Sequence, residues 1–441
     1  MTNQGKVYFK NIHAGNITKE IDGSYTFQYK NNTAPSVSLT LPTHTEIYKA
    51  EDLFPFFDGL IPEGWLLNLA QKNWKIPKND RMTLLLTTCH DCIGASSVQT
   101  TDKLNAYINP VLKKNEQPTI KHQSDRCMIC LQDLDSKNDL YHAKCATRLF
   151  GFAHTPFIDV HQADLENLAL QQINQRLTLT GVQKKLSLSP LKENDTSKAS
   201  QVRLTIVGLD GRFILKPAND EFPEMPAVEQ LSMKIAELHG LKMAQCGLVY
   251  LASGELAYIT KRFDRIDNQK IQMEDFCQLS RLMTEKKYNG SSEKMGKVID
   301  EFSSAPGDDK VTLFQTLLFS FWIGNADMHL KNFSLWKDPD TNLIRLSPGY
   351  DHLSTRLLIS SKEDSEELAL PLNGKKNKLR WHDFEALTAS FKIPSKVASH
   401  LKTKMLSLMP QTQDLINRSF LEKKTKEALI SLITERSHRL S

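Results

Sequence analysis

The sequence predicts an α+β chain of two lobes, the first rich in strands and the second rich in helices, with an extra small subdomain before them. Strand and turn signals recur up to about residue 270, helical spacing dominates beyond about residue 275, and a polar stretch follows residue 100. We therefore expect a small subdomain (1–110), a linker (111–125), a cysteine-bearing segment with the strand-rich lobe (126–270), and a helical lobe (271–441).

The first segment is predicted to combine short strands with one helix. Val7–Phe9 and Tyr25–Phe27 are rich in residues that favour strands, and Asp22-Gly23 supplies a turn between them. A helix is predicted over Ile61–Trp74, which has a proline near its start and apolar residues at helical spacing.

The strand-rich lobe is predicted from three strands and a helix. Lys185–Pro190 alternates apolar and polar residues. Arg203–Val207 and Arg212–Lys216 flank a Gly-Leu-Asp-Gly turn and therefore predict a hairpin. Ala227–His239 has helical spacing, and the later pattern is helical except for a strand-like interruption around 335–346.

Composition and charge exclude several classes of protein. The net charge of +5, from 56 basic and 51 acidic residues, permits an acidic partner but does not by itself argue for nucleic acid. The first ten residues lack the apolar run of a signal peptide, and Val311–Gly324 is too short and too polar to span a bilayer. Seven cysteines do not suggest a secreted disulfide framework. We expect a cytoplasmic protein without a membrane partner.

The strongest chemical signal is the run from Asp327 to Asn332. Phosphoryl transfer needs a carboxylate that accepts the nucleophile's proton and oxygen ligands for magnesium. Asp327 and Asn332 have the spacing of the protein-kinase catalytic loop, and Asp351 is expected to be a second magnesium ligand. Ala326 stands where protein kinases have Arg, and His329, which we expect at the nucleotide site, gives the Asp-x-His pattern of the lipid-kinase-like branch.

Residues upstream are expected to hold the nucleotide. Lys216, at the end of a predicted strand, suits a contact with the α- and β-phosphates, and Glu229 on the next helix is expected to pair with it. A loop with one glycine is expected to meet the phosphates through backbone N–H groups and lysines. Its residues are Thr180, Gly181, Val182, Gln183, Lys184 and Lys185.

Each of these features has a simpler explanation by itself. Asp and Asn are common in turns, and Lys216 and Glu229 taken singly would be a solvated strand end and an exposed helix face. Their order along the chain is what favours chemistry, because loop, strand Lys, helix Glu, Asp-x4-Asn and Asp follow one another as in kinases. We therefore predict a two-lobed, protein-kinase-like fold.

With these residues the chain resembles the HipA family. Asp327–Ser334 resembles the catalytic loop of that family, Tyr350-Asp351 its metal-binding Asp, and Arg262–Arg265 the segment that links its two lobes. Phe57–Trp65 and Asp91–Ala95 resemble its N-terminal subdomain. The resemblance covers nearly the whole chain.

The resemblance implies a toxin of a type II toxin–antitoxin module. Such a toxin uses ATP and magnesium to phosphorylate serine or threonine in a protein, typically an aminoacyl-tRNA synthetase. A HipB-like DNA-binding antitoxin restrains it, so DNA is contacted only through the antitoxin. In some systems the N-terminal subdomain is a separate protein, HipS, and the kinase, HipT, begins near a Cys-x2-Cys element. Cys127 onward resembles that start, and residues 1–110 resemble a fused HipS-like subdomain.

The resemblance also implies roles for individual residues. Asp327 is the expected catalytic base, Asn332 and Asp351 the magnesium ligands, and Lys216 the phosphate-contacting lysine. The family autophosphorylates a Ser just before the glycine of the loop that meets the phosphates. Autophosphorylation is therefore expected on Thr178 or Thr180, which precede Gly181. The residues implied at the adenine-side hinge are Lys261, where Glu is usual, Arg262 and Phe263.

A cluster of cysteines suggests a metal site outside this constellation. Cys127-x2-Cys130-x11-His142-x2-Cys145 has the ligand types and pair spacings of a small structural zinc site. The alternative is that these residues are buried hydrophobic thiols.

Two other functions stay open. The Asp-x-His pattern also resembles the phosphoinositide kinases, so a lipid or small molecule is an alternative substrate. A non-enzymatic, zinc-bearing DNA-binding regulator with a vestigial kinase fold is the second alternative. The intact set of Lys216, Asp327, Asn332 and Asp351 argues against it.

Overall fold

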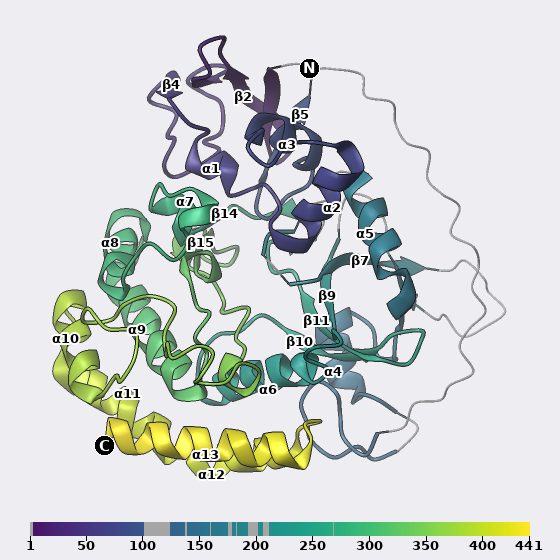
Figure 1. The fold of residues 1–441 in the computed structure, drawn as a ribbon, viewed down its shortest axis with the longest axis vertical. Helices are drawn as coiled ribbons and strands as arrows, with labels where there is room; N and C mark the ends of the chain where they lie inside the picture. Colours follow the sequence, from purple (N-terminus) through teal and green to yellow (C-terminus); the bar gives the residue numbers. More distant parts are fainter. Residues whose placement is uncertain are drawn as a thin grey trace.

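The computed structural model of the protein describes residues 3–100, 124–136, 139–158, 160–174, 179–181, 183–192, 202–205, 211–267 and 269–441. We call the described residues from 3 to 100 the N-terminal subdomain, those from 124 to 261 the strand-rich lobe, and those from 262 to 441 the helical lobe (Figure 1). Most of the predicted linker, 111–125, lies outside the described residues, so its role stays a prediction.

The N-terminal subdomain is an antiparallel sheet of five strands with three short helices and a hydrophobic core of its own. The predicted strands and helix are present, but the strand β2 was not foreseen. The Asp22-Gly23 turn joins β2 to β3, whereas β1 pairs with β2 and β5. In sheet order the strands are β4 (Ile47–Ala50), β3 (Tyr25–Tyr29), β2 (Ile12–Lys19), β1 (Gln4–Phe9) and β5 (Ser96–Thr100), and the helices are α1 (Pro55–Asp58), α2 (Gly64–Trp74) and α3 (Arg81–Thr88).

The strand-rich lobe is built on a six-stranded sheet. The predicted hairpin between Arg203–Val207 and Arg212–Lys216 is wrong, because β7 lies between β8 and β9 and pairs with both. Gly211 lies against Ser187 of β7, so the chain enters β9 alongside β7. In sheet order the strands are β10 (Cys246–Tyr250), β11 (Leu256–Lys261), β9 (Phe213–Pro217), β7 (Leu186–Lys192), β8 (Val202–Thr205) and β6 (Phe157–Ile158), and the helices are α4 (Ala143–Phe150), α5 (Leu165–Asn174) and α6 (Met225–Leu238).

The helical lobe is centred on α9 (Pro306–Ile323), whose apolar side chains are buried almost all round. The apolar stretch Val311–Gly324, which the sequence showed to be too short and too polar to span a bilayer, lies in this helix and its C-cap. Among the described helices, none combines the length and hydrophobicity of a membrane-spanning segment. The other elements are β12 (Arg265–Ile266), β13 (Gln269–Lys270), β14 (Met273–Asp275), β15 (Ser334–Lys337), β16 (Ile344–Leu346), α7 (Phe276–Leu279), α8 (Ser292–Phe302), α10 (Trp381–Phe391), α11 (Ser395–Ser407), α12 (Met409–Arg418) and α13 (Lys423–Leu440).

The N-terminal subdomain contacts both lobes. Helix α2 packs against α5 of the strand-rich lobe, and α1 packs against α7 of the helical lobe. Leu66 and Leu69 of α2 also belong to the hydrophobic core that runs through the two lobes. The subdomain therefore lies across the junction of the lobes, on the side opposite to α12 and α13 (Figure 1).

Candidate active site

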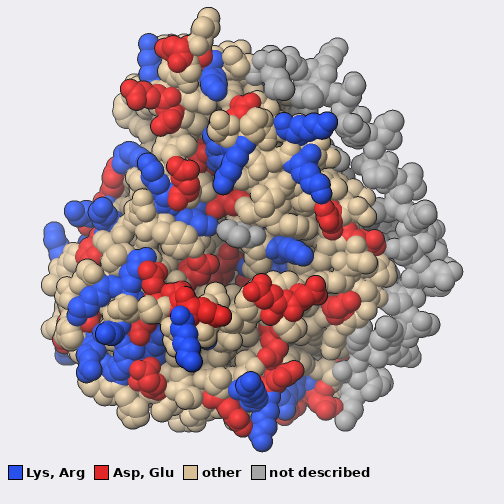
Figure 2. Space-filling view, viewed as in Figure 1, with Lys and Arg blue, Asp and Glu red and all other residues tan. Residues whose placement is uncertain are grey.

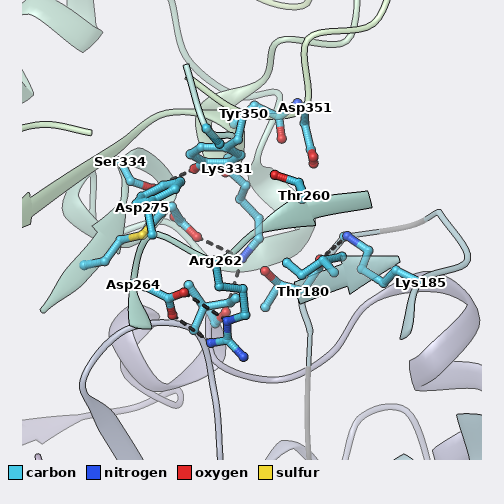
Figure 3. Close-up of a pocket in the computed structure, with 18 of the residues that line it drawn as sticks. Thr180, Lys185, Thr260, Arg262, Asp264, Asp275, Lys331, Ser334, Tyr350 and Asp351 are labelled. Atoms are coloured by element: carbon cyan, nitrogen blue, oxygen red, sulfur yellow. Dashed lines mark hydrogen bonds and ion pairs between the residues drawn. The ribbon is translucent and has the colours of Figure 1, made fainter. Parts of the chain in front are cut away.

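A pocket lies where the two lobes and the N-terminal subdomain meet (Figure 3). Asp and Glu side chains border the recess in the middle of this face (Figure 2). Residues that line the pocket include Gly59 and Glu63 from the subdomain, Thr180, Gly181, Lys185 and Lys216 from the strand-rich lobe, and His329, Asn332 and Asp351 from the helical lobe.

Lys216 joins three elements at the back of this pocket. It lies on β9, one of the inner strands of the sheet, and its side chain is 3% exposed. Its Nζ lies 2.5 Å from Oε1 of Glu229 on α6 and 2.5 Å from Oδ1 of Asp351. The structure therefore brings the predicted lysine, its helix partner and the second predicted magnesium ligand together, although Asp351 lies 135 residues after Lys216.

The opposite charges in this cluster offset the unfavourable effect of burial on each charged form. Burial opposes the positive charge of Lys216, but Asp351 and Glu229 outweigh burial and hold the pKa of Lys216 above its ordinary value. Burial also opposes ionisation of Asp351, yet Lys216 and Lys185 keep its pKa well below the usual range. Burial raises the pKa of Glu229 to about 7. Asp351 is thus the ionised carboxylate, and its side chain is still 35% exposed.

The position of Asp351 is fixed by its backbone conformation and by the hydrogen bonds of Tyr350. Its φ of 56° lies in the left-handed region, which Asp tolerates better than most residues. The hydroxyl of Tyr350 donates a 3.0 Å hydrogen bond to the Lys331 carbonyl and lies 2.6 Å from the Ser334 hydroxyl. Tyr350 therefore fixes the position of Asp351 relative to the Asp327–Asn332 loop.

The Asp327–Asn332 loop follows α9 directly. Asn325 Oδ1 accepts a hydrogen bond from the Asp327 amide at 3.1 Å, and Asn332 Nδ2 donates to the Asp327 carbonyl at 2.8 Å. These bonds close the loop on itself. Asp327 is exposed and is not among the residues that line the pocket, whereas Asn332 is half-buried and lines it.

Tyr288 is a residue at this site that sequence reasoning missed. Its hydroxyl donates a 2.6 Å hydrogen bond to Asp327 Oδ1, and its ring lies 5.0 Å from the ring of His329. Burial, together with nearby Lys287, lowers the pKa of His329. No pattern around residue 288 signals these contacts, because they join segments about 40 residues apart.

The loop expected to meet the phosphates divides into two groups. Lys185 is buried, lines the pocket and donates to the Thr180 carbonyl, while Gly181 has a φ of 105° that suits glycine. Burial lowers the pKa of Lys185. Lys184 instead lies over the ring of Trp65, and Gln183 donates to the sulfur of Met225. Thr178 and Val182 lie outside the described residues.

The predicted hinge also contacts the N-terminal subdomain. Lys261, Arg262 and Phe263 line the pocket, and the Phe263 ring lies against Trp336 and Tyr350. The Arg262 guanidinium, however, faces Asp264, with its Nη2 at 2.7 Å from Asp264 Oδ2, and donates to the Cys92 carbonyl (Figure 3). The side chain of Arg262 thus connects the hinge to the N-terminal subdomain.

Glu63 provides a second connection, directly to the catalytic loop. Its carboxylate lies 3.0 Å from Lys287 Nζ and 3.5 Å from Lys331 Nζ, and Lys331 also lies 3.1 Å from Asp275. All these side chains are at most 12% exposed. Burial opposes ionisation of Glu63, but Lys331 and Lys287 prevail and hold its pKa below the ordinary value.

Glu63→Gln is expected to lower the free energy of unfolding by about 3–5 kcal/mol, the usual cost of breaking a buried ion pair. Denaturant unfolding measures the loss. Glu301→Gln is the matched control, because Glu301 pairs with Arg281 but both are about half exposed, and it should cost less than about 1 kcal/mol. Because the Glu63 pKa is lowered on folding, its contribution is present above the unfolded pKa and is lost as the pH falls. Equal losses in the two variants would contradict the prediction.

The predicted zinc ligands form a separate cluster. The ligand atoms of Cys127, Cys130, His142 and Cys145 all lie within 4.8 Å of one another, and none of these residues lines the pocket.

Comparisons with known proteins agree with this architecture. Residues 5–99 match a family model described as the HipA N-terminal domain, and residues 177–413 match one described as the HipA-like C-terminal domain. A solved structure described as the Shewanella oneidensis MR-1 toxin antitoxin system HipA, HipB and its operator DNA complex has a TM-score of 0.68 and 17% identity, with 99% of this chain and 97% of that chain covered. This likeness shows a two-lobed, kinase-like fold.

Two curated relatives come from Sinorhizobium fredii. The protein named "Putative kinase Y4dM" is 33% identical over 235 residues, which cover 50% of this chain and 55% of the relative. The protein named "Putative kinase Y4mE" is 28% identical over 357 residues, which cover 77% of this chain and 74% of the relative. The chain thus spans about half the length of the first of these relatives.

Proposed function

Because the chain belongs to the HipA family, we propose that it is an ATP- and magnesium-dependent kinase that phosphorylates serine or threonine in a protein. The observation that carries the proposal is the cluster of Lys216, Glu229 and Asp351, in which Lys216 and Asp351 line the pocket between the lobes and the buried Glu229 pairs with Lys216. A lysine held by a helix carboxylate, with a second carboxylate facing the same pocket, is the arrangement that positions nucleotide phosphates in kinases.

The residues of the site fit magnesium and ATP. Asp351 and Asn332 supply hard oxygen ligands on one side of the pocket, and Asp351 is ionised. Magnesium, when bound, neutralises charge on the phosphates. Lys216 and Lys185 would contact the phosphates, and Phe263 at the hinge offers an aromatic surface for the base.

The proposed reaction follows from this placement. The substrate hydroxyl oxygen attacks the γ-phosphorus, the bond from that phosphorus to the bridging oxygen breaks, and ADP leaves. Asp327 accepts the hydroxyl proton, and its exposed position allows a large substrate to reach it. The hydrogen bond that the Tyr288 hydroxyl donates to Asp327 Oδ1, and the one that the Asp327 amide donates to Asn325 Oδ1, hold Asp327 for this role.

The partners are proposed at the level of the family. The S. oneidensis HipA structure is described as a complex with HipB and operator DNA, which supports a HipB-like antitoxin for this chain and contact with DNA only through it. We further propose a toxin that acts on a translation component such as an aminoacyl-tRNA synthetase. The fusion of a HipS-like subdomain to a HipT-like kinase stays a prediction.

A transfer assay tests the proposed function. The purified chain is incubated with magnesium, γ-³²P-labelled ATP and bacterial protein extract, and labelled amino acids are then separated. Phosphoserine or phosphothreonine in extract proteins is the expected result. When lipid vesicles are supplied beside the extract, label in the lipid alone would favour the lipid alternative. A separate titration that finds no magnesium-dependent binding of ATP would favour the non-enzymatic one.

Autophosphorylation is expected near Gly181. Thr180 lines the pocket, and a phosphate adds about −1.5 to −2 charges, which would repel the phosphates of ATP and compete for Lys185 and Lys216. Mass spectrometry after incubation with ATP should find phosphate on Thr178 or Thr180 in the wild type and none in Asp327→Asn. If the wild type phosphorylates other proteins but neither threonine, self-inactivation is wrong and the kinase proposal stands.

A further inference from the structure

We propose that Cys127, Cys130, His142 and Cys145 bind one zinc ion, which cross-links the turn that holds Cys127 and Cys130 to the start of α4. The four ligand atoms lie within 4.8 Å of one another. In a tetrahedral zinc site with ordinary bond lengths, a sulfur and a nitrogen ligand lie about 3.6 Å apart. His142 Nδ1 lies 3.4 Å from Cys130 Sγ and 3.9 Å from Cys145 Sγ, on either side of that value.

The tautomer of His142 is already the one that a metal needs. His142 Nε2 lies 3.0 Å from the Asp133 carbonyl oxygen. A carbonyl only accepts hydrogen bonds, so Nε2 carries the hydrogen, and in the neutral imidazole the lone pair of Nδ1 faces the cysteines. Metal-ligating histidines are commonly oriented by a carbonyl or carboxylate in this way.

The backbone presents the two ligand pairs separately. Cys127 and Cys130 lie in a tight turn, in which the Leu131 amide donates to the Cys127 carbonyl at 2.9 Å and the Cys127 amide donates to the Gln132 carbonyl at 2.8 Å. Leu131 adopts a φ of 65° to close this turn. His142 is the N-cap residue of α4, and Cys145 lies in its first turn. A helix N-terminus stabilises a thiolate.

Hydrophobic packing accounts for Cys127 but poorly for Cys130 and Cys145. Cys127 is buried, as are Cys246 and Cys277, whereas Cys130, Cys145 and His142 are only half-buried. Within the described part of the chain, no other group of three or more His, Cys, Asp or Glu side chains is identified as able to hold a metal. Partly exposed thiols that converge on an imidazole nitrogen indicate a ligand shell.

The site lies beside β10 and beside α6, the helix that carries Glu229. The Tyr141 hydroxyl donates to the Leu248 carbonyl of β10 at 2.8 Å, and Gln230 of α6 donates to the Ile129 carbonyl at 3.1 Å. Segment 124–151 contains only one short helix, α4, and no strand among its described residues. A metal is therefore expected to supply the cross-link that regular structure does not, as in other small metal-bound segments.

Elemental analysis of the full chain, purified without chelator, tests the proposal. Zinc close to one ion per chain is expected. Cys130→Ser/Cys145→Ser should lose it and unfold at a lower temperature. Cys277→Ser is the matched control and should keep it, because Cys277 is buried elsewhere and its thiol donates only to backbone carbonyls.

A second measurement does not depend on the folding of variants. The wild type is titrated with a mercurial that blocks thiols, and zinc release is followed with a coloured chelator. Release that is complete once the ligand thiols are blocked supports the site. Folded wild-type protein without zinc, another metal in its place, or a disulfide among these cysteines would overturn the proposal.

Discussion

Replacement of Asp327 with asparagine is expected to lower the rate of phosphoryl transfer by about 10²–10⁴-fold, the usual contribution of a positioned general base. The fold should be kept, because Asp327 is exposed and asparagine still accepts the hydrogen bond from Tyr288. The measurement is single-turnover transfer from ATP to a protein substrate, with circular dichroism and thermal unfolding as checks on the fold.

Asp308→Asn is the matched control for this substitution. Asp308 lies in the first turn of α9, the helix that leads into the Asp327–Asn332 loop, and its side chain is 82% exposed. The control should transfer phosphate at the rate of the wild type. Equal rates for Asp327→Asn and the wild type would show that Asp327 is not the base.

Asp351→Asn is expected to weaken magnesium-dependent ATP binding by about 10–100-fold, the range found when a group that supports a metal site is lost. The change removes the ionised oxygen ligand, while Lys216 keeps Glu229 as a partner. Calorimetric titration with ATP in magnesium measures the effect.

The same titration in EDTA separates the two roles of Asp351. Without magnesium, Asp351→Asn should bind ATP at least as well as the wild type, because one negative charge has left the pocket. An unchanged affinity in magnesium would contradict the assignment of Asp351 as a metal ligand.

Local motifs predicted much of the fold and of the site. The order of Lys216, Glu229, Asn332 and Asp351 along the chain was enough to predict one site: Lys216, Asn332 and Asp351 line the same pocket, and Glu229 pairs with Lys216. The helix predicted at Ala227–His239 is α6, because its apolar residues face the core at helical spacing. These features depend on short stretches of sequence with strong local preferences.

Features that depend on distant pairing could not be predicted. The turn before Arg212 favoured a hairpin, but β9 pairs with β7, and no local preference reports which of two strands a third will join. Glu63 pairs with Lys287 and with Lys331 across more than 200 residues, and Tyr288 reaches Asp327 by tertiary packing alone. Lys184 and Lys185 are adjacent in sequence, yet only Lys185 points into the pocket.

The position of the N-terminal subdomain has a mechanical consequence. A two-lobed enzyme commonly admits and releases nucleotide by rotation of one lobe about its connection to the other. In this chain the connection is hydrogen-bonded to the N-terminal subdomain. Arg262 and Arg265 donate to the Cys92 carbonyl, and Asp264 accepts from the Gly94 amide. Glu63 of the subdomain also pairs with Lys331 of the Asp327–Asn332 loop, and α2 packs against α5 of the strand-rich lobe. In the proposed kinase, a rotation that opens the pocket must carry the subdomain with one lobe and slide it over the other, so ADP release is expected to depend on this sliding contact.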